Sequence, residues 1–515
     1  MKKRRCLALL LTLLMLLEAI ATTVYAKAAE APKTPYYVAV GDSIASGYGL
    51  RGNAPERLFA DFHFLTDVVH NSAASSYPRL VADGIAQALT GTKKAQDSAF
   101  ANLGAPGYAL TDYNYIFRET DPEKLRTYVN PFWEKNIQTL AKVITPEKEL
   151  DWAEFQWANT LVEETKKADL ITFHLGANDV MQPLWTLMNN HENPLIKLFG
   201  YLLKIAVLDV DITKLDLGSA MEALSGNSGG PLDVREIWGS INEKTLRECL
   251  AFLDQDNLTQ ILMDSANEIK ELYGETLDQV RKLNPTAKIV VVGSYNPYGN
   301  STEYHGVNYT PARIISQLYV ELKFGLPIIS RQLLGGIKYS LLHGMLGEMA
   351  QEPLEDLNKT AKAAAEERGF PFVNTMDKVS NEARLAIHPT AKQQKQIADA
   401  ILEVLMPRIR YGSDTWKADP FGADAPTQVP YGTEVTLTVP AGAVFVTVNH
   451  ERVWDNTMKT RYVHFTATEP DTIVYAHYSQ TETCPQLTRW KTETQAVQKT
   501  IRNHLDRICL LSFGK

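Results

Sequence analysis

Five short apolar segments alternate with helical patterns over the first 410 residues, and this alternation limits the possible folds more than any other feature. The segments cover residues 36–40, 99–103, 170–175, 288–292 and 370–373, and each is followed by Gly or Asn. Continuous apolar runs of this length are typical of parallel strands that are covered on both faces. Strands that alternate with helices predict an α/β domain with a mostly parallel sheet.

The segments between these strands have the three-to-four-residue spacing of helices with one apolar face. The clearest runs cover 262–280, 354–361 and 397–405. The last one is preceded by Thr390 and Gln393, a capping-box pair in which each side chain bonds the backbone amide of the other residue. We therefore expect a helix to begin directly after residue 390.

Three long stretches interrupt the alternation, at about 111–165, 181–260 and 299–350, and we interpret them as large helical insertions. The second contains a strongly apolar run, 195–207, whose only charges are two lysines seven residues apart. Such a run forms a lid over an apolar substrate, a surface that touches lipid, or an insertion helix buried against the domain. We favour the buried helix, because a buried helix often carries lysines along one stripe.

Residues 1–26 have the pattern of a secretory signal peptide: a basic start, an apolar run and small residues before the predicted cleavage point. We exclude them from the fold and expect a protein that is secreted or held at the cell surface. The leader carries a charge of +3, so the remaining 489 of the 515 residues carry −11 rather than −8. A chain this acidic is a poor partner for nucleic acid or an anionic membrane surface.

The pattern changes near the C-terminus. Residues 419–432 are rich in Pro, Gly and Asp, as a linker is. Apolar and polar residues then alternate at 435–439, 444–448, 463–465 and 474–476. This alternation predicts a small β-sandwich-like module over 425–480. The α/β domain then covers 35–409, and the tail 481–515 has no structural assignment.

Cysteine usage indicates no metal site. We expect Cys249, in a helical stretch, to be a buried small apolar residue. Cys484 and Cys509 can pair in an oxidising compartment, but the sequence does not decide whether they do. The chain has no Cys-x-x-Cys motif and no histidine-rich cluster, so we expect neither a metal nor another cofactor.

The segment Gly41-Asp42-Ser43 follows the first predicted strand. A serine where a buried strand meets a helix has its hydroxyl and its own amide at the carboxyl edge of the sheet, where ligands of open α/β sheets bind. That position suits a nucleophile, which needs exposure on one side and a rigid anchor on the other. Gly-Asp-Ser is also an ordinary turn tripeptide, so the role of Ser43 depends on the segments that follow.

Three further polar segments stand at element boundaries. After the second strand, Gly104 or Gly107 offers an unobstructed backbone amide, and Asn178, after the third strand, offers a side-chain amide. Both groups are suitable donors to an oxyanion. His388 precedes the capped helix. Each signal alone has an ordinary structural explanation, but the four together, in one order, make a much stronger signal.

This arrangement resembles the SGNH hydrolases, also called GDSL hydrolases, a family of esterases and lipases, over roughly residues 35–409. The resemblance implies a flavodoxin-like three-layer α/β/α sandwich. It also implies that Ser43 is the nucleophile and His388 the general base. The oxyanion hole would consist of the amides of Ser43 and Gly107 and the side chain of Asn178.

One residue departs from the family pattern. An Asp normally lies three residues before the histidine, where this chain has Leu385. The third member of a triad orients the imidazole and stabilises its protonated form. Glu382, Asp377 and a backbone carbonyl are the alternatives, and we favour the carbonyl or Glu382. Otherwise the enzyme works as a Ser-His dyad.

The resemblance predicts a secreted serine esterase or lipase that hydrolyses carboxylic esters through an acyl-enzyme. One alternative is a carbohydrate esterase that removes acetyl groups from polysaccharide, with the C-terminal module contacting glycan or the cell surface. Another is an inactive cell-surface binding protein, which the missing Asp would suggest. Retention of all four polar segments argues against inactivity, and the insertions slightly favour a lipid ester over a glycan ester.

Overall fold

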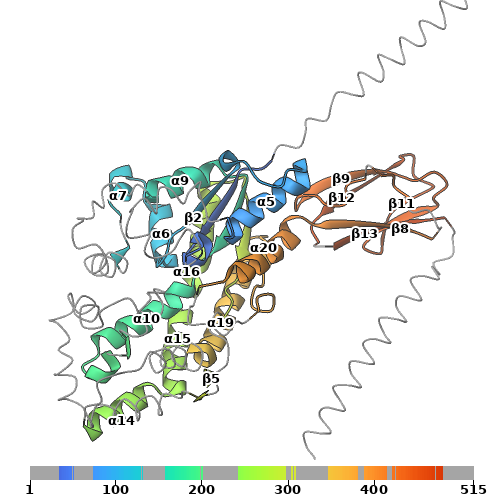
Figure 1. The fold of residues 1–515 in the computed structure, drawn as a ribbon. Coiled ribbons are helices and arrows are strands. Elements are labelled where there is room, and N and C mark those ends of the chain that lie inside the picture. The colour runs from blue at the N-terminus through green and yellow to red at the C-terminus, as the bar shows by residue number, and fades with distance from the viewer. Residues whose placement is uncertain are drawn as a thin grey trace, which may run out of the picture. The chain divides into compact units, whose positions relative to one another are not determined.

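The computed structural model describes residues 34–48, 50, 74–128, 130–131, 157–197, 199–200, 242–296, 303–304, 307–308, 346–380, 388–414, 420–423, 425–469 and 471–478. The chain divides into two compact units, Met1–Ile401 and Leu402–Lys515. Figure 1 shows the elements of both units, which are described separately below.

A five-stranded parallel sheet forms the centre of the first unit (Figure 1). Its strands are β1 (Tyr37–Gly41), β2 (Phe100–Gly104), β3 (Leu170–His174), β4 (Lys288–Val292) and β7 (Phe372–Val373). Their spatial order is β2-β1-β3-β4-β7, and every neighbouring pair is parallel. Counted along the chain, this is the order 2-1-3-4-5 of flavodoxin-like doubly wound folds. The predicted α/β class and its five strands are confirmed.

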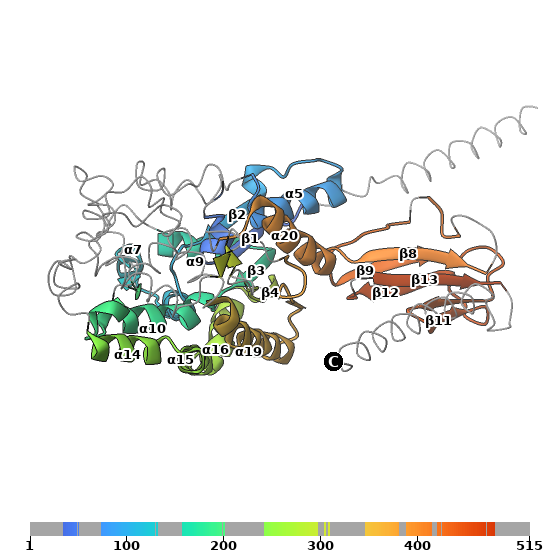
Figure 2. The ribbon, with the colours of Figure 1, turned by 60° about the horizontal axis from the view of Figure 1, so that its bottom comes forward.

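Helices cover both faces of this sheet. One face packs against α6 (Leu110–Arg118), α9 (Trp157–Lys167), α16 (Lys270–Leu283) and α19 (Leu346–Glu367). The other face lies against α5 (Tyr77–Thr90) and α20 (Ala391–Leu405), on the opposite side of the strands in Figure 2. All residues of β1, β2 and β3 are buried, which explains why these segments are continuous apolar runs.

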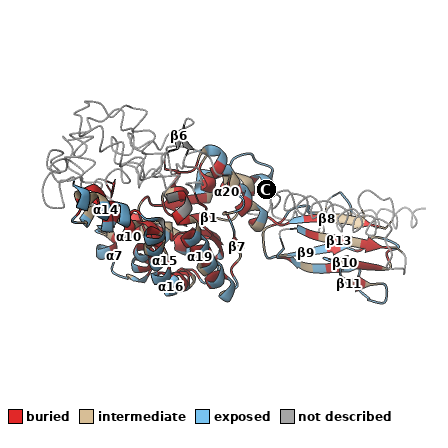
Figure 3. Ribbon diagram, turned by 90° about the horizontal axis from the view of Figure 1, so that it is seen from below, coloured by how far each residue is buried: buried red, intermediate tan, exposed pale blue. Residues whose placement is uncertain are grey.

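The two faces of the sheet differ in polarity. Val40 and Phe173 belong to the large apolar core that includes residues of α6, α9, α16 and α19, and Figure 3 colours buried residues red. The α5 face is more polar: Tyr37 and Thr172 share a hydrogen bond of 2.8 Å between their hydroxyls. His174 is fully buried there, and burial lowers its pKa to about 4, so its ring is neutral at physiological pH.

The first unit contains further elements: α2 (Ser43–Ser46), α7 (Pro122–Arg126), α10 (Ala177–Asn190), α14 (Glu243–Phe252) and α15 (Gln255–Glu268), besides the 3₁₀ turn η1 (Asp97–Ala99) and the pair β5 (Glu303–Tyr304) and β6 (Val307–Asn308). The apolar face predicted over 262–280 belongs to two helices, because the chain leaves helical geometry at Ile269. The described residues Leu195, Ile196 and Phe199 are buried in the core, as expected for a buried insertion helix. Residues 201–207 of that run lie outside the described residues.

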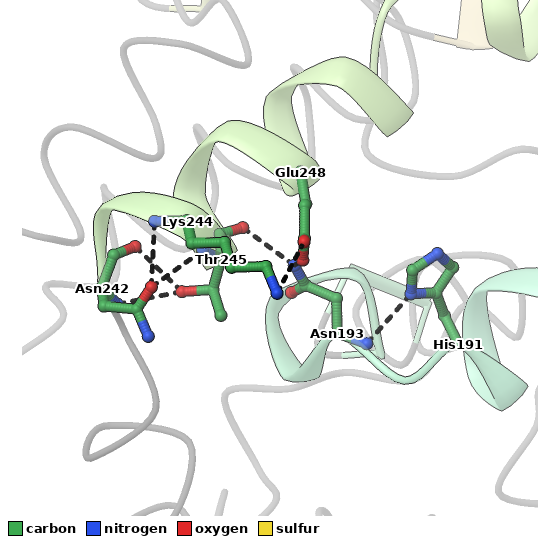
Figure 4. A network of polar contacts seen from close by, with 6 residues as sticks. All are labelled: His191, Asn193, Asn242, Lys244, Thr245 and Glu248. Carbon is green, nitrogen blue, oxygen red and sulfur yellow. Dashed lines mark hydrogen bonds and ion pairs between the residues drawn. The ribbon is translucent and has the colours of Figure 1, made fainter.

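A polar network joins the two ends of the second insertion (Figure 4). Asn193, just after α10, donates through Nδ2 to the carbonyl of Thr245 at 2.8 Å and to Glu248 at 3.3 Å. Asn242 caps α14, accepting from the amides of Lys244 and Thr245, while Thr245 Oγ1 accepts from the amide of Asn242. The chain therefore enters α14 beside the point at which it leaves α10.

The second unit contains two sheets that share one apolar core. The strands are β8 (Arg408–Ser413), β9 (Thr433–Thr438), β10 (Phe445–Val448), β11 (Glu451–Asp455), β12 (Tyr462–Ala467) and β13 (Asp471–His477). One sheet has the order β11-β10-β13-β8 and the other pairs β12 with β9. Leu437 and Val463 from the small sheet and Val446 and Val474 from the large one belong to the same core. The predicted β-rich region is present, and β8, which pairs in parallel with β13, was not expected.

Cys249 is buried in the core of the first unit, as predicted, and burial raises its pKa to about 12. Cys484, Cys509 and the predicted signal peptide lie outside the described residues. Among the residues that the structure describes, no helix is long and apolar enough to cross a membrane. The same residues contain no group of His, Cys, Asp and Glu arranged to hold a metal ion.

Candidate active site

The residues singled out in the sequence gather at the carboxyl edge of the parallel sheet. Ser43 follows β1, Gly107 follows β2 and Asn178 follows β3. Because β2 and β3 flank β1 on opposite sides, the end of β1 is the topological switch point, where ligands of such sheets bind. The strand order therefore brings three of the four predicted segments to one edge.

Ser43 is the first residue of α2, a single helical turn. Asp42 is its N-cap and accepts a hydrogen bond of 2.9 Å from the amide of Ile44. Ser43 is half-buried, whereas the residues around it, from Gly41 to Tyr48, are buried. Neither its amide nor its hydroxyl donates a hydrogen bond to any residue that the structure describes. An amide at a helix N-terminus has no partner within the helix, so this one is free for a ligand.

The end of β2 supports α2 directly. A Cβ atom on Gly104 would lie 2.4 Å from the amide nitrogen of Ser46, so only glycine permits this approach. Asn102 donates through Nδ2 to the carbonyl of Ala45 at 2.8 Å and accepts through Oδ1 from the amide of Gly104 at 3.0 Å. The amide of Gly104 is thus occupied, which leaves Gly107 as the glycine donor of this segment.

Gly107 lies in a tight turn. The amide of Tyr108 donates to the carbonyl of Ala105 at 3.2 Å, and Gly107 has φ of 76°. Pro106 followed by a residue with positive φ is the pattern of a type II turn, which requires glycine at that place. The turn does not use the amide of Gly107, and no described residue accepts from it. Its carbonyl accepts from Gln182 Nε2 at 2.6 Å.

Asn178 is the second residue of α10 and is half-buried. Its Nδ2 donates to the carbonyl of Tyr108 at 2.8 Å. An amide nitrogen carries two hydrogens, so this bond fixes the side chain and leaves the second hydrogen for a ligand. Gln182 lies one helical turn later, so two side chains of α10 hold two successive carbonyls of the turn.

Two buried carboxylates fix the residues that follow the turn. Asp179 accepts from the amides of Leu110 at 2.6 Å and Thr111 at 3.3 Å, the first residues of α6. Asp112 accepts from the amide of Ala109 at 2.7 Å. Burial raises the pKa of Asp179 to about 7 and also raises the pKa of Asp112. Both carboxylates serve amides at the N-terminal end of α6, where a negative charge is favourable.

His388 lies beside α2. Its ring centroid is 4.5 Å from that of Tyr48, whose amide donates to the carbonyl of Ser43 at 3.1 Å. Burial raises the pKa of Asp42 to about 6, against the lowering effects of the Ile44 amide and of the charge on His388. The structure therefore brings His388 to the turn that carries Ser43, next to Tyr48 and Asp42. The hydroxyl of Ser43 does not donate to it, and catalytic hydrogen bonds are often long before substrate binds.

The group that orients His388 was left open between several alternatives. Asp377 is exposed, and its carboxylate accepts from Asn374 Nδ2 at 2.9 Å. Glu382 and Leu385 lie outside the described residues. Asp42 interacts electrostatically with His388, although in the sequence it is only part of a turn tripeptide. The sequence could have indicated this interaction, because Asp42 is adjacent to Ser43 and a general base that serves Ser43 comes close to both residues.

Residues 37–205 match the family model of the GDSL-like lipases and acylhydrolases. This match contains Ser43, Gly107 and Asn178, at the sheet edge described above. The chain carries a GDSL-like hydrolase domain. His388 lies beyond the matched residues, and the geometry around Tyr48 is what associates it with this domain.

Three solved structures are similar to this chain. The extracellular lipase from Streptomyces rimosus is 16% identical, with 71% of this chain and 97% of that chain covered and a TM-score of 0.27. The phospholipase A1 from Streptomyces albidoflavus NA297 is 13% identical, with 72% and 98% covered and a TM-score of 0.28. The lipase Lip_vut3 from a goat rumen metagenome is 12% identical, with 71% and 94% covered and a TM-score of 0.29.

These similarities are too weak to assign a fold or a function. The fold of the domain is assigned from its own strand order. A search of the curated proteins finds no match.

Proposed function

We propose that this protein is a secreted serine esterase that hydrolyses carboxylic esters, with Ser43 as nucleophile and His388 as general base. One observation carries the proposal: the half-exposed Ser43 and the unbonded amide of Gly107 share the carboxyl edge of the sheet with the side-chain amide of Asn178. Three donors at one edge suit an oxyanion that develops during acyl transfer. The GDSL-like domain supports the same chemistry, because its family consists of lipases and acylhydrolases.

In the first half of the reaction, His388 takes the hydroxyl proton of Ser43 while Oγ attacks the carbonyl carbon of the ester. The carbonyl oxygen becomes the oxyanion, which accepts hydrogen bonds from the amides of Ser43 and Gly107 and from Asn178. The carbon–oxygen bond to the alcohol then breaks, and the alcohol leaves with the proton from His388. In the second half, water attacks the acyl-enzyme, gives a proton to His388, and the carboxylic acid leaves as Ser43 regains its proton.

The proposal does not specify a lipid ester. An acyl groove formed by the apolar run 195–207 would have favoured a lipid substrate. Its described residues Leu195, Ile196 and Phe199 are instead buried in the core of the domain. The proposal therefore covers carboxylic esters in general, and the acyl length is a quantity to be measured.

Hydrolysis of p-nitrophenyl esters from acetyl to palmitoyl tests the proposal. We expect Ser43→Ala and His388→Asn each to lower kcat/KM by about 10³-fold or more, because the two residues act as a unit. A fluorophosphonate should label the wild type but not Ser43→Ala. Turnover restricted to acetyl esters, with acetate released from acetylated polysaccharide, would favour the carbohydrate esterase.

Two results would contradict the proposal. Unchanged turnover in Ser43→Ala would remove Ser43 from the role of nucleophile. No turnover of any of these esters by the wild type, together with no fluorophosphonate labelling, would favour the inactive binding protein.

A further inference from the structure

Gln394 is a fully buried amide that bonds to the ends of two helices near the candidate site. It lies in α20, six residues after His388, and its side chain is 0% exposed. A buried glutamine must satisfy both its donor group and its acceptor oxygen within the protein. The partners of these two groups indicate what the residue does.

The donor group contacts the helix that carries the nucleophile. Gln394 Nε2 donates to the carbonyl of Ile44 at 3.0 Å. Ile44 directly follows Ser43 in α2, a helix too short to satisfy its own carbonyls. The other described donor to this carbonyl is the amide of Gly47, at 3.2 Å. Gln394 therefore holds α2 one residue away from the nucleophile.

The acceptor oxygen contacts the start of α5. The amide of Tyr77, the first residue of α5, donates to Gln394 Oε1 at 2.8 Å. Ser76 occupies the N-cap position but makes no side-chain cap bond. Gln394, which belongs to α20, thus supplies an acceptor for the first amide of α5. A single side chain therefore links α20 to both α2 and α5.

The backbone of Gln394 is coupled to the segment that holds His388. Its amide donates to the carbonyl of Thr390 at 2.8 Å. Thr390 and Gln393 form the capping box that begins α20, with bonds of 2.9 and 3.0 Å. His388 lies two residues before Thr390. A shift of α20 at Gln394 thus displaces His388, while a shift of α2 displaces Ser43.

We propose that Gln394 is a positioning residue that holds Ser43 and His388 at the separation needed for proton transfer, an inference that rests on the proposed function. The ring contact of 4.5 Å between Tyr48 and His388 is another link between the two segments. Misplacement of reacting groups by about 1 Å can lower a rate by about 10²-fold. Loss of the Gln394 bridge should therefore act on kcat.

Two variants and a matched control separate positioning from simple stabilisation. Gln394→Met keeps the side-chain length and removes both bonds. Gln394→Glu keeps an acceptor for the amide of Tyr77 and removes the donor to Ile44. The control is Asn284→Leu, which removes another buried side-chain amide, one that donates to two backbone carbonyls at 2.8 Å. Asn284 precedes β4 and therefore lies at the amino edge of the sheet, away from the candidate site.

The first measurement is kcat, KM and Tm with the p-nitrophenyl ester that the wild type hydrolyses fastest. We expect both Gln394 variants to lower kcat by about 10- to 100-fold while KM stays within about threefold. Asn284→Leu should lower Tm comparably and keep kcat within about threefold of the wild type. The proposal is overturned if both Gln394 variants keep the wild-type kcat, or if Asn284→Leu loses as much kcat as they do.

The second measurement does not depend on turnover. The Tyr48 ring follows α2 and lies against His388, so its ring current marks the position of α2 relative to α20. In protein with isotope-labelled histidine, the NMR signal of the His388 ring can be assigned through His388→Asn. Gln394→Met should move this signal, and Asn284→Leu should not; an unmoved signal in Gln394→Met overturns the proposal. If the wild type hydrolyses no ester, this measurement still decides the role of Gln394, and only the proposed function is wrong.

Discussion

At the scale of single residues, Asp42 has two tasks in the turn that carries Ser43. Its carboxylate caps α2 through the amide of Ile44 at 2.9 Å, and its charge interacts with His388. The position at which the family places an Asp holds Leu385. We expect Asp42 to stabilise the imidazolium that forms when His388 accepts the proton of Ser43.

Asp42→Asn tests this electrostatic role. Asparagine keeps an acceptor for the amide of Ile44 but removes the charge, so kcat at about pH 8 should fall about tenfold, equivalent to about 1.4 kcal/mol. Because the pKa of Asp42 is raised to about 6, protonation removes the same charge from the wild type at lower pH. The ratio of wild-type to variant kcat should therefore shrink as pH falls through 6. A ratio that does not change with pH would contradict the role.

Asp377→Asn should leave kcat/KM within about twofold of the wild type. Asp377 is exposed and already accepts a hydrogen bond from Asn374, so it is unsuited to orient a buried imidazole. Glu382→Gln is the comparison: a loss of about tenfold or more would identify Glu382 as the orienting acid, and an unchanged rate would favour a backbone carbonyl. A large loss in Asp377→Asn would contradict this assignment.

At the scale of elements, α10 fixes the turn that contains Gly107 through side chains of its first two turns. Asn178 and Gln182, four residues apart, lie on one face of the helix and donate to the carbonyls of Tyr108 and Gly107. The spacing of the two amides is visible in the sequence. Their acceptors are not, because they lie 70 and 75 positions away in the chain.

Gln182→Met should lower kcat about tenfold with little change in KM, because the carbonyl of Gly107 loses its bond of 2.6 Å from Gln182 and the amide of Gly107, the proposed oxyanion donor, is less well aligned. Gln260→Met is the matched control. Gln260 is an exposed glutamine of α15 whose side chain donates to Asp264. Equal kcat values in the two variants would show that α10 does not support the turn in this way.

Asp179 should make the stability of the first unit depend on pH. Burial raises its folded-state pKa from 3.8 to about 7, so the folded protein binds this proton more tightly than the unfolded chain. The stabilising contribution is complete below the unfolded pKa and is lost as pH rises through the folded one. Between about pH 5 and 8.5, this residue alone should lower the free energy of unfolding by about 2–3 kcal/mol.

Urea unfolding at these two pH values measures the effect of Asp179. Asp179→Asn removes the titrating group, so the difference in unfolding free energy between the two pH values should be smaller than in the wild type. An equal difference in both proteins would mean that other groups produce it.

At the scale of the whole molecule, the second unit has a core of its own, and β8 is part of it. Ile409 in β8 belongs to that core, and β8 pairs along its length with β13. The boundary predicted at residue 409 cuts through β8, which ends before the Pro- and Gly-rich linker. Its apolar residue Ile409 gave too short a pattern to indicate which sheet it joins.

A fragment that covers 402–478 should unfold cooperatively, as followed by far-UV circular dichroism. A fragment that covers 425–478, which begins where the sequence predicted the module, lacks β8. It should lose that cooperativity, because one side of β13 is left unpaired and Ile409 is missing from the core. Identical unfolding curves for the two fragments would show that β8 is dispensable.

Much of the first unit was predictable, for a physical reason that its strands share. β1, β2 and β3 are buried along their whole length, so their sequences are apolar runs that local inspection finds. The capping box of Thr390 and Gln393 was predictable because both bonds lie within four residues. The break at Ile269 was missed, because α15 and α16 keep the same apolar spacing on both sides of it.

The sequence by itself determined where the strands and helices lie and which residue types stand at the strand ends, because local periodicity and neighbours a few positions away decide both. Only the tertiary structure decided that β1 is the switch point and that Asp42, Gln182 and Gln394 belong to the surroundings of Ser43. Those relations depend on the order of the strands in the sheet and on bonds between residues as far as 350 positions apart. No local pattern records such a pairing, because it exists only once the chain has folded.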